Sequence, residues 1–295
     1  MFDAFSVSAT DTAEKKTSLF KQSMKRLFRN KGAVAGLIIL ILFILLAVFA
    51  NSITPYEYSK MDVKNKNLLP CAEHWFGTDD LGRDIFTRVA YGGRYSLQIG
   101  IFGTGLGVII GSAIGSLCGY YGGLVDDIVM RGIDIIQAVP NMLFAVVVAA
   151  ALGTGVYELI LAMAISSVPH FVRIIRGSIL SIRKMEYLDA AVVDNASTFK
   201  IITSHLIPNS LAPLIVQATM STAHVILTAS SLSFIGLGVP PPAPEWGAML
   251  AGARGFLRNY PHMLTFPGLA IMMTVLSLNL LGDGLRDALD PKLKR

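Results

Sequence analysis

Apolar residues in this chain are gathered into long stretches that contain no Asp, Glu, Lys or Arg. Five such stretches cover residues 32–50, 95–125, 135–157, 206–244 and 259–282. Each reaches the roughly 20 residues that a helix needs to cross about 30 Å of hydrocarbon. A sixth stretch, residues 159–172, is shorter and contains Pro169, but Arg173 and Arg176 can extend it by snorkelling to the membrane surface. The pattern predicts an all-α integral membrane protein with six transmembrane helices.

The polar segments between these stretches divide the chain into one accessory span and a five-span core. About thirty polar and charged residues precede the first apolar stretch, so we expect this stretch to remain as an anchor rather than to be cleaved as a signal. The expected units are a cytoplasmic tail with a basic segment at the membrane surface (1–30), the first span (31–51), an extracytoplasmic loop (52–94), the core (95–286) with a cytoplasmic loop (177–207), and a cytoplasmic tail (287–295).

Composition and charge agree with a membrane protein. The chain is 53% hydrophobic and only 15% charged, whereas soluble domains carry about 25% charged residues. Lys and Arg gather before residue 32, between residues 173 and 200, and after residue 285. Six spans place these three segments on one side, which the positive-inside rule identifies as the cytoplasm. The net charge of +5 then reflects topology and contact with anionic lipid, and no nucleic-acid partner is expected.

The sequence offers no catalytic or nucleotide-binding pattern. It contains no Gly-x-x-x-x-Gly-Lys-[Ser/Thr] loop, and no Ser-His-Asp or paired-carboxylate arrangement stands out. Cys71, Glu73 and His74 lie close together, but three donors without a further ligand group favour an ordinary polar loop over a metal site. We therefore expect a protein that is not an enzyme and holds no cofactor, so any ATP and Mg²⁺ must be bound by partner subunits.

A ladder of glycines at every fourth position marks the second stretch. Glycines at this spacing form a flat stripe on which another helix can pack closely in lipid. A functional hinge is the alternative interpretation. The ladder consists of Gly103, Gly107, Gly111, Gly115 and Gly119.

A stripe of polar residues marks the fifth stretch, at steps of four, three, four and three. It consists of Gln217, Ser221, His224, Thr228 and Ser231. The steps place them on one helical face, which must avoid lipid. This face either lines a translocation path or forms hydrogen bonds between helices. For His224, a neutral imidazole bonded to a facing helix is favoured over a contact with a proton or substrate. The prolines that follow, at 240–242 and 244, preclude a regular helix and place Glu245 and Trp246 near the outer interface.

The inner segment RKMEYLDAAVVDNASTFKIITSHLIPN, residues 183–209, predicts a short helix, a turn, and a second apolar helix that begins near Pro208. It resembles the EAA loop of binding-protein-dependent ABC import permeases. Asp189-Ala190-Ala191 stands for the Glu-Ala-Ala element, and Asn195 replaces its Gly, since Asn tolerates the left-handed conformation. The resemblance implies that an ATPase is contacted through Glu186, Asp189, Ala190, Ala191, Asn195 and Pro208.

Three further segments resemble the C-type permease of dipeptide, oligopeptide and nickel importers. They are WFGTDDLGRDIFTRVAYGGRYSL (75–97), SLSFIGLGVPPPAPEWGAML (231–250) and PGLAIMMTVLSLNLLGDGLRDALDP (267–291). The resemblance implies a type I importer permease fold, a homologous second permease, two ATPase subunits and an extracytoplasmic binding protein. It also implies peptide cargo, with nickel or a metal chelate as the alternative. A proton-coupled secondary carrier would need charged residues within the spans, where this chain has chiefly His224.

Overall fold

The computed structural model describes residues 21–183, 185 and 195–289, and within these ranges it is helical with no β-strand. A helix over residues 21–29 precedes the named elements. The helices that follow are α2 (Lys31–Val48), α3 (Ala50–Ile53), α4 (Ile85–Tyr121), α5 (Gly123–Ala138), α6 (Asn141–Leu152), α7 (Val156–Ile182), α9 (Thr198–Ile201), α10 (Ile207–Phe234), α11 (Trp246–Ala253) and α12 (His262–Leu289). Two short 3₁₀ turns, η1 (Val63–Asn65) and η3 (Arg254–Phe256), and a π turn, η2 (Ile202–Leu206), complete the set.

Five helical segments are long and apolar enough to cross a membrane: α2, α4, α7, α12, and α9 through α10. The pair α5 and α6 passes the same test only when the two are taken together, with a 93° bend between them. Helix α5 ends at Ala138 because Pro140 cannot donate the backbone hydrogen bond that would continue it. Val139, which precedes the proline, is extended (φ −82°, ψ 131°), and α6 begins directly after Pro140. The stretch 135–157 is thus a broken span rather than the single helix that its composition predicts.

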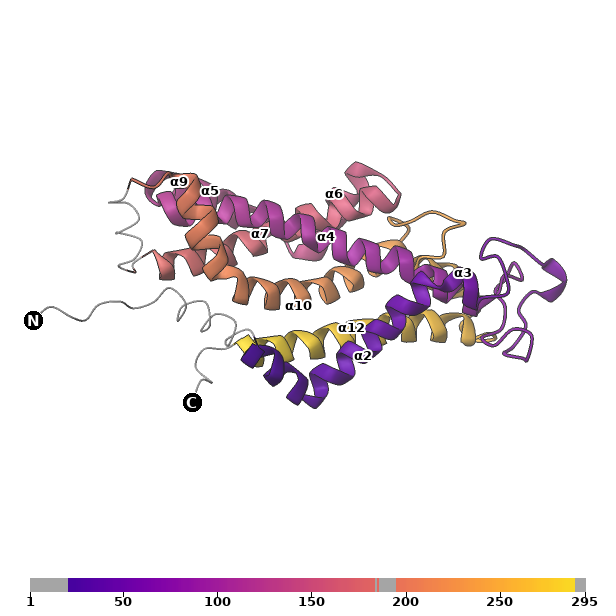
Figure 1. Ribbon diagram of the computed structural model, residues 1–295. Coiled ribbons are helices and arrows are strands. Elements are labelled where there is room, and N and C mark those ends of the chain that lie inside the picture. The colour runs from indigo at the N-terminus through magenta and orange to yellow at the C-terminus, as the bar shows by residue number, and fades with distance from the viewer. Residues whose placement is uncertain (1–20, 184, 186–194, 290–295) are drawn as a thin grey trace, which may run out of the picture.

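Helices α4 and α7 form the most extensive packing in the structure, and they run parallel. The glycine ladder of α4 lies in this contact. A methyl group on Gly103 would lie 2.9 Å from Cβ of Met163, and one on Gly119 would lie 2.8 Å from Cγ2 of Ile179. Residue numbers therefore increase in the same direction along both helices, which makes α4 and α7 parallel. Two consecutive parallel helices require the chain between them to return to the starting side. The bent pair α5–α6 makes that return, which gives six crossings and confirms the predicted fold class (Figure 1).

The shortest of the six apolar stretches, residues 159–172, lies in α7, which is 27 residues long. Arg173 and Arg176 are within this helix, where they pair with Asp134 and Asp126 of α5. The Arg176–Asp126 pair is bidentate, with both N···O distances 2.5 Å. Helix α7 continues to Ile182, past residue 177, where the cytoplasmic loop was expected to begin.

On the other side of α4, the accessory span α2 packs against α12, and α10 packs against both α12 and α4. A methyl group on Gly36 of α2 would lie 2.6 Å from the carbonyl oxygen of Ser277 in α12, so these two backbones also approach closely. Helix α4 begins at Ile85, nine residues before the expected end of the outer loop at residue 94. Asp84 caps the helix there, because it accepts a hydrogen bond from the backbone N–H of Thr87 at 2.7 Å.

Figure 1 shows where the connecting segments lie. The helix of residues 21–29, α9 and the end of α12 gather at one end of the bundle, and the long loop between α3 and α4 lies at the opposite end. The described parts of the three basic segments therefore lie at the same end, as six crossings require.

Candidate translocation path and coupling segment

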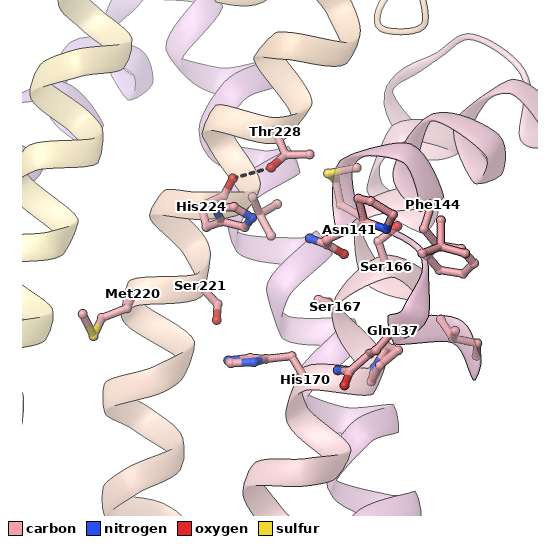
Figure 2. A pocket seen from close by; sticks show the side chains of 16 residues that line it. Gln137, Asn141, Phe144, Ser166, Ser167, His170, Met220, Ser221, His224 and Thr228 are labelled. Atoms are coloured by element: carbon pink, nitrogen blue, oxygen red, sulfur yellow. Dashed lines mark hydrogen bonds between the residues drawn. The ribbon is translucent and has the colours of Figure 1, made fainter. Parts of the chain in front are cut away.

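A cavity of about 540 Å³ lies between the α5–α6 bend, α7 and α10 (Figure 2). The bend sets Gln137 and Asn141 at its wall, one on each side of Pro140. The middle of α7 contributes Ser166 and His170 to the same wall. Two of the sixteen lining residues are His and none is Asp, Glu, Lys or Arg, so the hydrogen-bonding groups of the cavity are amides, hydroxyls and imidazoles.

Only part of the polar stripe of α10 lies in the wall of this cavity. Ser221, His224 and Thr228 line it, and His224 is exposed. Gln217 interacts with His170 of α7 near the cavity. Ser231 lies outside the lining.

Two hydroxyl groups of the stripe form hydrogen bonds within α10 itself. Oγ1 of Thr228 donates to the carbonyl oxygen of His224 at 2.9 Å, and Oγ of Ser231 donates to that of Leu227 at 2.9 Å. Both hydroxyl groups are satisfied within their own helix, so they do not join α10 to a neighbour. Gln217 of the same stripe does join α10 to α7, through its hydrogen bond with His170.

Sequence reasoning missed the lining residues of α5, α6 and α7. They are Gln137, Asn141, Ser166, Ser167 and His170. The rule applied to α10, that polar groups within an apolar stretch avoid lipid, also applies to them. Their spacing shows no single helical stripe because the bend at Pro140 separates the first two and the other three belong to another span.

The coupling residues are only partly described. Glu186, Asp189, Ala190 and Ala191 lie outside the described residues. Asn195 has φ +57°, the left-handed conformation expected for it.

The helix after this turn begins at α9, ten residues before Pro208, rather than near that proline. The π turn η2 lies just before Pro208 and has a hydrogen bond from Ile207 N–H to the carbonyl oxygen of Ile202. A π turn spaces the backbone so that the proline, which lacks an N–H, is accommodated without ending the helix.

Glu245 and Trp246, which were expected near the outer interface, are both fully buried inside the protein. The Glu245 carboxylate accepts hydrogen bonds from the backbone N–H groups of Gly247 (2.9 Å) and Ala248 (2.8 Å), and from Oγ of Ser96 in α4 (3.2 Å). Burial raises the pKa of Glu245, and the two backbone donors act in the opposite direction. This carboxylate therefore caps α11 inside the protein.

The outer loop is held to α4 and to the proline segment by polar contacts. Nη1 of Arg88 donates to the carbonyl oxygens of Tyr58 (3.0 Å) and Pro242 (3.4 Å). Nε of Arg83 pairs with Asp79 at 2.6 Å. Among the described residues, no group of three or more His, Cys, Asp or Glu side chains is placed to hold a metal ion.

A helical protein with six membrane crossings, and with a cavity among its spans that contains amide, hydroxyl and imidazole groups but no Asp, Glu, Lys or Arg, has the architecture of a membrane permease. Residues 111–295 match the family described as "Binding-protein-dependent transport system inner membrane component", and residues 18–70 match "N-terminal TM domain of oligopeptide transport permease C". The chain belongs to this family of permease subunits of ABC importers. It is a transport component rather than an enzyme, as the sequence predicted.

Curated relatives cover nearly the whole chain. The dipeptide transport system permease protein of Alkalihalophilus pseudofirmus is 46% identical over 94% of this chain and 91% of its own length. The glutathione transport system permease protein of Pectobacterium atrosepticum is 44% identical over 93% and 92%. The oligopeptide transport system permease protein of Bacillus subtilis is 40% identical over 100% and 98%.

Proposed function

We propose that this chain forms part of the path by which an ATP-driven importer moves di- and oligopeptides across the cytoplasmic membrane. The observation that carries the proposal is the cavity between α5–α6, α7 and α10, whose largely apolar wall also offers amide, hydroxyl and imidazole groups but no Asp, Glu, Lys or Arg. The names of the three relatives, which refer to dipeptides, oligopeptides and glutathione, support peptide cargo.

The lining suits a peptide backbone. An amide that leaves water needs replacement hydrogen bonds, since burying it unpaired costs several kcal/mol (about 2–7). The amides of Gln137 and Asn141 and the hydroxyls of Ser166, Ser221 and Thr228 can donate and accept. No Asp, Glu, Lys or Arg of the lining would trap a charged cargo side chain. The cavity volume of about 540 Å³ also falls within the range typical of small-molecule sites, roughly 300–1,000 Å³.

Energy must reach this cavity from partners, because the sequence has no phosphate-binding loop. We infer a heterodimer with a homologous permease, two ATPase subunits that bind ATP and Mg²⁺, and a binding protein on the outer side. Residues 186–195 are the proposed ATPase contact, with both chain termini on the same cytoplasmic side. The turn at Asn195 and the continuous helix from Thr198 into α10 would carry movement of this contact to Ser221 and His224.

Uptake of a labelled dipeptide by the reconstituted importer tests this proposal. Uptake should require ATP, the binding protein and both permeases, and Ala190→Trp should abolish it while Ala190→Ser preserves it. Peptide uptake without ATP would favour the secondary carrier, and normal uptake by Ala190→Trp would contradict the proposed contact.

Nickel or a metal chelate is retained as a second cargo because two imidazoles, His170 and His224, face the same cavity. Imidazole is a common ligand of transition metals. Competition between unlabelled peptide and radioactive nickel separates the two cargoes. Peptide uptake that is unaffected by excess nickel, with no nickel uptake, would support peptide cargo.

A further inference from the structure

The short helix of residues 21–29 presents two adjoining ridges to its surroundings. Lys21, Lys25 and Arg29 recur at every fourth position and are exposed. Met24 and Phe28 follow next around the helix, at about 100° per residue, and their exposed fractions are 36% and 57%. A cationic ridge beside an apolar ridge is the arrangement of helices that lie in a membrane interface.

The protein fixes this helix in place. Leu27, on its remaining side, is buried with Ala33 of α2 and Ala288 of α12. Asn30 accepts a hydrogen bond from the backbone N–H of Ala33 (3.2 Å) and donates one to Asp287 near the end of α12 (3.3 Å). The docked face leaves the side chains of both ridges exposed.

The connection to α2 determines which surface that is. Only Asn30 separates the helix from Lys31, where the first span begins. The helix therefore lies at the level where the chain enters hydrocarbon, with Met24 and Phe28 able to reach the acyl boundary. Within the residues that the structure describes, no ion pair involves Lys21, Lys25 or Arg29.

We propose that residues 21–29 form a binding site for anionic phospholipid on the inner leaflet, with phosphate headgroups on the ridge of Lys21, Lys25 and Arg29. The proposal rests on the cytoplasmic placement of this end given under the proposed function, but it does not depend on the cargo. Bound lipid would hold the helix against the end of α12 through Leu27 and Asn30.

A spin label on Met24→Cys tests the proposal in the assembled importer, freed of other reactive cysteines and reconstituted with or without phosphatidylglycerol. Phosphatidylglycerol should immobilise the label and shield it from a water-soluble relaxation agent. Because one basic residue near an anionic leaflet contributes about fivefold to binding, K21Q/K25Q/R29Q should weaken this lipid response roughly 100-fold.

The matched control K60Q/K64Q/K66Q removes the same charge from exposed positions of the outer loop and should leave the response intact. Equal label mobility in both lipids would overturn the proposal, as would an equal effect of the control. A K21Q/K25Q/R29Q variant that loses its ATPase subunits equally in both lipids would assign the ridge to a protein partner instead. A lipid response in an importer that takes up no peptide would leave this proposal standing and reject the cargo.

Discussion

Replacing Gly111 by Ala should loosen the contact between α4 and α7, although alanine is the better helix former. The added methyl group would lie 2.5 Å from Cβ of Phe171, and 3.1 Å from the carbonyl oxygen of Val168. Neither atom is the end of a flexible side chain, so the helices must move apart. Overpacking of this kind costs about 1–3 kcal/mol, while Gly to Ala within a helix gains about 0.5–1 kcal/mol. Subtracting the gain from the cost leaves an expected net destabilisation of up to about 2.5 kcal/mol.

Gly105 of the same helix provides the matched control. A methyl group there meets no atom within 4 Å, so Gly105→Ala should keep the helix-propensity gain without the packing cost. Thermal unfolding of the purified chain in detergent should rank Gly105→Ala at or above the wild type and Gly111→Ala below it. The reasoning is refuted if Gly111→Ala is as stable as Gly105→Ala.

Three further perturbations test other contacts. Trp246→Ala should destabilise the chain by about 3–5 kcal/mol. Trp246→Phe should destabilise it by about 1–3 kcal/mol, because the carbonyl oxygen of Val89 loses its hydrogen-bond donor. Equal stability of the two variants in thermal unfolding would contradict this prediction. Asp126→Ala should cost about 1–2 kcal/mol and reduce uptake, because Arg176 is left unpaired, and D126R/R176D should recover most of the loss; no recovery would refute the pairing. Burial raises the pKa of Glu245, so the stability that its protonated form contributes is present at low pH and is lost as pH rises through the raised pKa. Glu245→Gln, which stays neutral, should therefore gain in apparent Tm relative to the wild type at high pH. A Tm difference between the two proteins that is constant at all pH values would refute the assignment.

Composition alone predicts the spans, because every backbone group in hydrocarbon must be paired and the chain must therefore cross as apolar helices. The glycine ladder likewise indicates a close helix contact before any partner is known. Neither pattern identifies the partner. That α4 meets α7, two crossings later, and in parallel, depends on the path of the whole chain.

Only the α10 wall of the cavity could be predicted from the sequence. The α10 stripe keeps one helical period, so its common face can be recognised from Ser221, His224 and Thr228. The opposite wall is made by two elements and a bend, and no single period describes Gln137 and His170 together. Pro140 marks the break, but whether it produces a kink or a 93° turn depends on how α5 and α6 pack on α7.

The burial of Glu245 and Trp246 could not be predicted from the local sequence either. The prolines correctly exclude a helix before Glu245, and a Glu at the start of α11 is a recognisable cap. Its burial arises because Ser96 and Val89 of α4, about 150 residues earlier, meet the cap and the indole. Contacts at such sequence separation leave no periodic trace in either segment.

The most direct test of the translocation path is the reactivity of cysteines introduced along α10 in the reconstituted importer. Ser221→Cys and His224→Cys should react with a charged thiol reagent that does not cross the membrane, and a transported peptide should slow the reaction. Ile215→Cys, which is exposed but lies outside the cavity lining, should stay unreactive in lipid. An absence of reaction at positions 221 and 224 in every transport state, or equal reaction at position 215, would contradict the account.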